Sequence, residues 1–97
     1  MPTFITLGKY TQKGIENIKE GPFRLDEAKK AFKAVGAEIK EFYLVNGEYD
    51  MVVIVEAPDD EIVAKLALII GSKGTSRSVT LRAFREDEYR KIISELP

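Results

Sequence analysis

Apolar and polar side chains alternate along residues 3–10 and again along residues 75–84, and this period of two predicts a β-strand in each stretch. Two more apolar stretches, residues 37–45 and 49–57, are predicted strands on either side of the dipeptide Asn46-Gly47. Asn-Gly is typical of tight hairpin turns because both residues tolerate positive φ. The pattern therefore predicts four strands, of which the middle two form a hairpin.

Apolar residues recur with helical spacing over residues 21–36 and 58–71, between the predicted strands, and over residues 86–96 after the last one. Pro22 suits the first turn of the first helix, and Gly36 is placed to end it. The predicted order is β-α-β-β-α-β followed by a C-terminal helix, which is the ferredoxin-like α+β arrangement. In this fold four antiparallel strands lie in the order 4-1-3-2, and both crossover helices cover one face. The whole chain, residues 1–97, is predicted to form this single domain.

The alternation also assigns strand residues to faces of the predicted sheet. The set expected to meet the helices is Ile5, Leu7, Met51, Val53, Val55, Val79, Leu81 and Ala83. The set expected on the opposite face is Phe4, Thr6, Gly8, Tyr10, Glu41, Tyr43, Asp50, Val52, Ile54, Glu56, Thr80, Arg82 and Phe84. Soluble monomers rarely leave a face with so many aromatic and aliphatic groups open to water. We therefore expect a second copy to pack on it about a two-fold axis, with a cavity between the two sheets.

Polar residues on that second face are the candidate ligand-binding groups. The end of the first strand and the start of the third meet at one edge, so Tyr10 and Asp50 should lie close together, with Tyr49 nearby. At the opposite edge Arg82 should approach Glu56, and a structural ion pair is the expected result. The predicted binding set is Thr6, Tyr10, Tyr49, Asp50 and Arg82. For Asp50 a purely structural role, bonded to backbone near the hairpin turn, is an equal alternative.

Three segments together resemble the GYD-domain family: TFITLGKYT at residues 3–11, GEYD at 47–50 and EAPDDE at 56–61. The resemblance covers essentially the whole chain and implies a dimeric α+β barrel of largely uncharacterised function. The chain departs from the family's Gly-Tyr-Asp motif, because Glu48 separates Gly47 from Tyr49. A more distant similarity exists to the ligand-sensing domains of leucine-responsive (feast/famine) regulators, which implies an effector held between subunits.

Composition limits the kinds of catalytic and metal site, and the kinds of partner, that the chain can have. The chain has no cysteine and no histidine, which excludes disulfides, thiolate nucleophiles, Cys/His zinc sites and histidine bases. No metal or other cofactor is expected. The 15 basic and 16 acidic residues give a net charge of −1, so neither nucleic acid nor membrane is an expected partner. No apolar run reaches the length of a membrane span, and a cytoplasmic protein is expected.

The sequence leaves three functions open and does not decide whether the chain is an enzyme. The first is a homo-oligomeric module that binds a small apolar or aromatic molecule. The second is a cofactor-independent isomerase or monooxygenase, with Asp50 or Glu56 as the base and Tyr10 as the proton donor. The third is a structural or adaptor dimer without a ligand.

Overall fold

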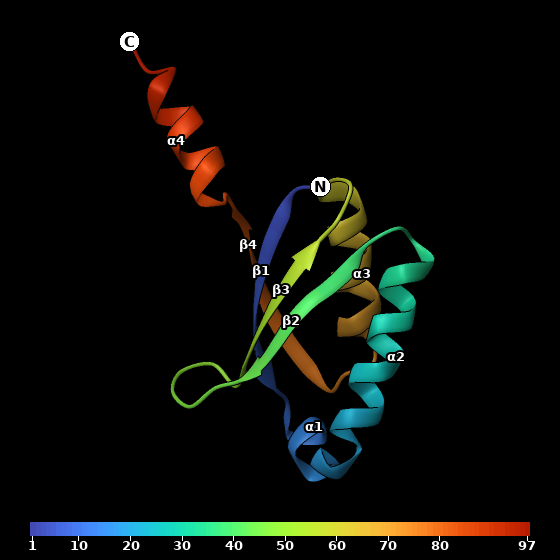
Figure 1. Cartoon of the computed structure of the whole chain (residues 1–97). Helices are drawn as coiled ribbons and strands as arrows, with labels where there is room; N and C mark the ends of the chain where they lie inside the picture. Colours follow the sequence, from blue (N-terminus) through green and yellow to red (C-terminus); the bar gives the residue numbers. More distant parts are fainter.

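The computed structural model describes all 97 residues and confirms the predicted α+β fold (Figure 1). The elements are β1 (Thr3–Tyr10), α1 (Gln12–Glu16), a 3-10 turn η1 (Ile18–Glu20), α2 (Gly21–Ala34), β2 (Glu38–Leu44), β3 (Met51–Glu56), α3 (Asp60–Ser72), β4 (Ser76–Ala83) and α4 (Glu86–Ser94). All strand pairs are antiparallel, in the order β2-β3-β1-β4, as expected.

The molecule has two layers. Helices α2 and α3 lie on one side of the sheet, and no element covers the other side (Figure 1). The shortest dimension is only 18 Å, whereas the longest is 52 Å. This thickness corresponds to one sheet plus one layer of helices. The second face of the sheet is therefore open to solvent unless a partner covers it. None of the helices is long and apolar enough to cross a membrane.

The strand pairing corrects the predicted faces of β1 and β4. Phe4 lies opposite Val55, and Thr6 lies opposite Val53. Residues directly opposite one another in antiparallel strands share a face, so Phe4 and Thr6 point toward the helices together with the buried valines. The prediction was right for β3 and wrong for β1 and β4. The apolar residues of those two strands that in fact point away from the helices are Ile5, Leu7, Val79, Leu81 and Ala83.

The physical reason is that alternation separates the two faces of a strand without saying which face meets the helices. In β1 and β4 the more apolar set faces outward, contrary to the usual preference for the core. In β2 a bulge at Lys40 shifts the register, so that Ile39 and Phe42 both lie on the helix side. Tyr43, predicted for the outer face, does lie there opposite Val52.

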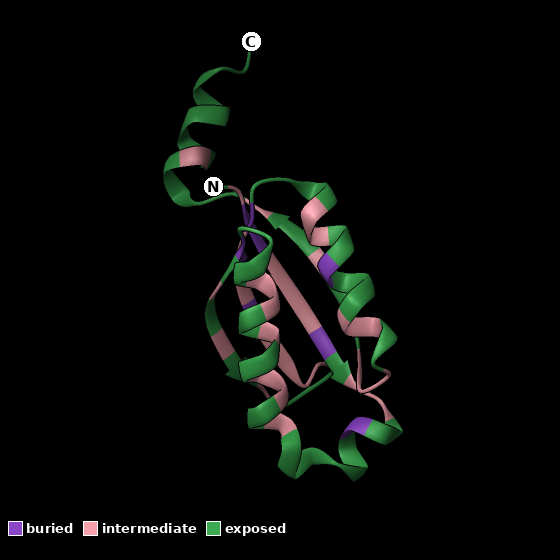
Figure 2. Ribbon diagram, turned by 90° about the vertical axis from the view of Figure 1, so that its right-hand side faces the viewer, coloured by how far each residue is buried: buried purple, intermediate pink, exposed green.

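The buried core is small and lies mostly at one end of the sheet. It consists of Phe4, Ala37, Val53, Val55, Ala57 and Leu66. Most of these residues come from the start of β1, the approach to β2 and the end of β3, near the N-terminus (Figure 2). Toward the opposite end of the sheet, the side chains between the sheet and the helices are only partly buried.

At that opposite end, a close contact joins α1 to the loop before β4. The Thr11 hydroxyl donates to the Gly74 carbonyl at 2.6 Å, and the Thr11 N–H donates to the Thr75 carbonyl at 3.1 Å. A Cβ built on Gly14 would lie 2.0 Å from the Thr75 carbonyl oxygen, so no larger residue fits there without moving the backbone.

We predict that Gly14→Ala lowers the free energy of unfolding by about 1–3 kcal/mol, the usual cost of overpacking a tight site. Gly21→Ala is the control, because a Cβ at Gly21 meets no atom within 4 Å. Urea denaturation measures both variants. Equal stability of Gly14→Ala and the parent chain would contradict the packing described at Thr75.

Candidate functional site

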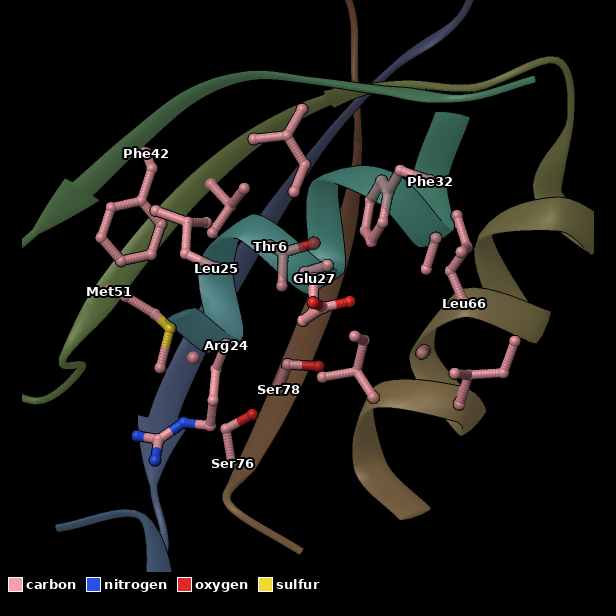
Figure 3. Close-up of a pocket in the computed structure, with 18 of the residues that line it drawn as sticks. Thr6, Arg24, Leu25, Glu27, Phe32, Phe42, Met51, Leu66, Ser76 and Ser78 are labelled. Carbon is pink, nitrogen blue, oxygen red and sulfur yellow. The ribbon is translucent and has the colours of Figure 1, made fainter. Parts of the chain in front are cut away.

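A hollow of about 590 Å³ lies between the sheet and helices α2 and α3 (Figure 3). We call it the helix–sheet hollow. Its floor comes from all four strands, and its walls come from α2 and α3. Phe42, Met51 and Ile70 give it an apolar lining. The hollow therefore lies within a single chain, on the helix side of its sheet.

Small side chains create this space. On the floor, Thr6, Gly8 and Ser78 occupy positions where helix-covered sheets usually carry valine, isoleucine or leucine. Above them, α2 presents Ala28 and Ala31. Protein interiors normally pack to the density of organic crystals, so small residues facing each other across a layer leave room unless a neighbour fills it. The hollow is thus encoded by residue size on both layers.

A row of hydroxyl groups crosses the floor of the hollow. Its members lie on the helix side of β1 and β4 and are Thr6, Tyr10, Ser76, Ser78 and Thr80. Thr6 lies opposite Thr80, and Tyr10 lies opposite Ser76. No hydroxyl of the row makes a hydrogen bond within the chain. Each hydroxyl can both donate and accept, so the row can bind polar groups of a guest molecule.

The charged lining of the hollow is mostly positive. It includes the cations Arg24, Lys30 and Lys73 and a single acid, Glu27. Lys30 lies 3.7 Å from Glu27, so that pair is neutralised. Arg24 donates instead to the carbonyls of Asn17 at 2.9 Å and Gly14 at 3.3 Å, and no carboxylate neutralises its charge. An anionic group is therefore favoured at the end of the hollow where Arg24 and Ser76 lie (Figure 3).

Of the five predicted site residues, Tyr10 and Asp50 lie together, and Thr6 lies further along β1 on the same side of the strand as Tyr10. The Tyr10 N–H donates to Asp50 Oδ2 at 2.9 Å, and the Asp50 N–H donates to the Gly8 carbonyl at 2.9 Å. Thr6 and Tyr10 line the hollow, whereas Asp50 fastens the end of β1 to the start of β3. The predicted proximity of Tyr10 and Asp50 is thus found, and the Asp50 carboxylate makes a structural contact with backbone.

The other two predicted site residues lie elsewhere. Tyr49 sits beneath the Lys9 ammonium, 5.3 Å from it, and does not line the hollow. The Arg82 guanidinium lies 5.6 Å from the Phe4 ring and 4.3 Å from the Phe84 ring, beside a smaller hollow at the other end of the sheet. Its acidic neighbour is Glu88, at 3.9 Å, so the predicted pair with Glu56 is wrong. The reason is that Arg82 points to the helix side, whereas Glu56 lies opposite Thr3 on the outer side.

Sequence reasoning missed Arg24 and the serines of β4 as candidates. The signal for the serines was present, because Ser76, Ser78 and Thr80 repeat a hydroxyl at every second position of one strand. No such signal marked Arg24, whose place depends on how α2 crosses the sheet. No group of three acidic, cysteine or histidine side chains could hold a metal ion.

The outer side of the sheet is the second candidate site. We call it the open sheet face, and it consists of Ile5, Leu7, Tyr43, Val52, Ile54, Val79 and Leu81. Tyr43, Val79 and Leu81 are exposed over 46–52% of their surface. These side chains come from all four strands and are neighbours in the pairing register, and soluble monomers rarely leave so many adjoining apolar groups open to water.

Comparisons with known proteins agree with this architecture. A family model described as GYD domain matches residues 4–93. The glutamine synthetase and cystathionine beta-lyase binding protein of Thermus thermophilus is 37% identical over 84 residues, which are 86% of this chain and 88% of that protein.

Two solved structures have similar backbones. The crystal structure of TTHA0845 from Thermus thermophilus is 26% identical with a TM-score of 0.56, over 88% of this chain and 95% of that chain. The crystal structure of FFRP-DM1 is 22% identical with a TM-score of 0.60, over 87% of this chain and 100% of that chain, and at this identity it shows a shared fold alone.

We predict that Asp50→Ala lowers the free energy of unfolding by roughly 1 kcal/mol, because the partly buried Tyr10 N–H loses its acceptor. Asp26→Ala is the matched control, since Asp26 lies on α2 and makes no ion pair or side-chain hydrogen bond. Thermal and urea unfolding measure the difference. Indistinguishable losses in the two variants would contradict a structural role for Asp50.

Proposed function

The chain belongs to the GYD domain family, and from that premise we propose that it is a homodimeric module that binds a small, mostly apolar acid. The dimer forms through the open sheet face, and each subunit holds its ligand in its own helix–sheet hollow. The observation that carries the proposal is that the two sides of the sheet differ in polarity. Hydroxyls point under the helices at Thr6 and Ser78, whereas aliphatic groups point outward at Ile5 and Leu81.

The open sheet face supports a dimer because its composition resembles a domain core cut in half. A two-fold axis brings the same surface from both copies together, so aliphatic groups of one copy meet aliphatic groups of the other. Burying Val79 and Leu81, each nearly half exposed in the single subunit, favours association through the hydrophobic effect. The charged residues on this side include Glu41 and Arg77, which lie on the edge strands β2 and β4, so the centre of the interface offers aliphatic contacts and no hydroxyl row.

The helix–sheet hollow supports ligand binding through its size and chemistry. Its volume of about 590 Å³ lies within the ~300–1,000 Å³ usual for small-molecule sites. Apolar walls suit an aliphatic or aromatic body, the hydroxyl row suits polar substituents, and Arg24 suits a carboxylate or another acid. Binding through Thr6, Tyr10 and Arg24 is therefore the arrangement we propose, with Asp50 as a supporting group.

A protein-binding role is the second candidate, and the name of the 37% identical relative favours it. That protein is named for binding two enzymes. By analogy, this chain would be an adaptor whose dimer presents its helical surface to an enzyme. The enzyme alternative has less support. Asp50, one of its two candidate bases, already accepts the Tyr10 N–H, and Glu56, the other, lies opposite Thr3 on the outer side of the sheet, away from the hollow.

We predict that Ala31→Phe weakens binding of both 8-anilinonaphthalene-1-sulfonate, an acidic apolar probe, and the neutral dye Nile red by at least about tenfold. The added ring fills the hollow next to Ala31, which costs about 1.4 kcal/mol or more of binding free energy. Ala34→Phe is the control, because Ala34 lies on the same helix outside the lining. Fluorescence titration of each protein gives the two dissociation constants.

Arg24→Gln separates the charge from the shape of the hollow. It should weaken the sulfonate probe several-fold and leave the neutral dye unchanged. Equal binding of both probes to the parent chain, Ala31→Phe and Arg24→Gln would overturn the ligand site and leave the adaptor as the better function.

We predict that Leu81→Glu raises the dimer dissociation constant at least about 100-fold, because it would place a carboxylate in the apolar centre of the interface. The single subunit should still fold, since Leu81 is 46% exposed in it. Leu68→Glu is the matched control on the exposed side of α3. Sedimentation velocity over a range of concentrations measures the assembly. A monomeric parent chain, or an intact Leu81→Glu dimer, would contradict association through this face.

A further inference from the structure

Helix α4 stands apart from the rest of the molecule. It extends from the end of β4 beyond the sheet and makes no layer with α2 or α3 (Figure 1). Its apolar residues are spaced at i, i+3, i+4 and i+7, so they form one stripe along the helix. We call this the α4 stripe, and it consists of Tyr89, Ile92 and Ile93 on the helix and of Leu96, just beyond its last residue Ser94. Each of the four is between 43% and 60% exposed.

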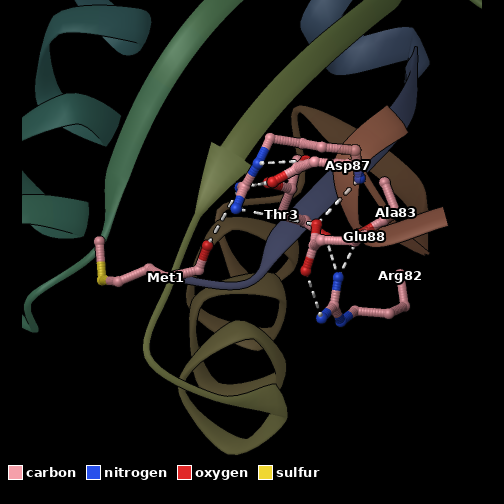
Figure 4. A network of polar contacts seen from close by, with 7 residues as sticks. Met1, Thr3, Arg82, Ala83, Asp87 and Glu88 are labelled. Carbon is pink, nitrogen blue, oxygen red and sulfur yellow. Dashed lines mark hydrogen bonds and ion pairs between the residues drawn. The ribbon is translucent and has the colours of Figure 1, made fainter. Parts of the chain in front are cut away.

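The root of α4 is firmly held. The Arg85 guanidinium donates to the Thr3 hydroxyl at 3.0 Å, and the Arg85 N–H donates to Glu88 Oε1 at 2.9 Å (Figure 4). Glu88 also lies 3.9 Å from Arg82. This network ties the first turn of α4 to β1 and β4. It sets the direction of the helix and gives no cover to the α4 stripe.

The free helix lacks the stabilisation that a nine-residue segment needs. Isolated helices shorter than about 12 residues are marginal in water even with favourable sequences. The ion pair between Glu86 and Arg90, at 2.8 Å, contributes only a few tenths of a kcal/mol at such an exposed position. Burial of the α4 stripe against another surface is the remaining source of stability.

We propose that α4 is an exchanged arm, whose stripe packs on the second copy of the chain in the homodimer. This rests on the proposed dimer. The argument for a second copy is continuity, because α4 directly follows β4, whose Val79 and Leu81 belong to the open sheet face. The helix also leaves on the side of the sheet opposite to α2 and α3, where the second copy lies (Figure 1). The two-fold axis makes the exchange reciprocal, so each dimer gains two such contacts.

Ile92→Asp tests the arm against Lys91→Asp, which places the same side chain on a neighbouring residue outside the α4 stripe and makes an even larger change in charge. We expect Ile92→Asp to raise the dimer dissociation constant at least tenfold and Lys91→Asp to change it less than threefold. Hydrogen exchange of the intact protein should show protected amides over residues 89–94 in the dimer, and Ile92→Asp should remove that protection. A parent dimer whose α4 amides exchange as fast as an unstructured peptide would overturn the arm and leave the dimer standing.

The absence of cysteine allows a direct test of where the arm lies. Tyr89→Cys is labelled with a benzophenone maleimide, and light and isotopically heavy copies are mixed before irradiation. Cross-links between light and heavy copies are the expected result. Cross-links only within one copy would show that α4 folds back on its own subunit and would overturn the exchange. If the parent chain is monomeric, both the proposed dimer and the arm fail, whereas an intact dimer without intermolecular cross-links removes the arm alone.

Discussion

The pairing of β1 with its two neighbours is the constraint on which the other features depend. β1 is central, with β3 on one side and β4 on the other, and its register sets the facing of both. Because Phe4 lies opposite Val55 and Arg82, the polar set of β1 and β4 points under the helices. A slip by one residue would reverse every side chain of a strand and exchange the hydroxyl floor for an aliphatic one. The helix–sheet hollow and the open sheet face are therefore two consequences of one register.

This arrangement has a cost in stability that favours a functional interpretation. A sheet that directs serine and threonine toward its helices forgoes the packing that valine or isoleucine would supply, and unfilled volume in a core lowers stability. The buried core is correspondingly small, and Leu66 is the only buried residue from α2 or α3. Proteins commonly keep such destabilising features where a ligand or partner uses them. The hollow and the two uncovered apolar surfaces fit that pattern.

The proposed dimer accounts for the open sheet face, the α4 stripe and the helix–sheet hollow together. Association through the open sheet face would cover the aliphatic side of the sheet, and the arm would cover the α4 stripe. The ligand hollow would stay accessible, because it opens on the opposite side, between α2 and α3. In this proposal, ligand binding and association would use opposite faces of one sheet.

The sequence alone determined the elements, their order and the α+β fold, because each depends on local signals. Alternation marks β1 and β4, Asn46-Gly47 marks the hairpin, and Pro22 with Gly36 bounds α2 closely. The meeting of Tyr10 with Asp50 also followed, since topology alone brings those strand ends together. Tertiary structure decided which side of β1 and β4 meets the helices, because both sides are chemically acceptable and only the pairing register chooses. The binding site that we propose depends on that choice, because it places the hydroxyl row on the helix side of the sheet. Arg24 lines the same hollow because of the path of α2 over the sheet, a long-range property that no local pattern carries.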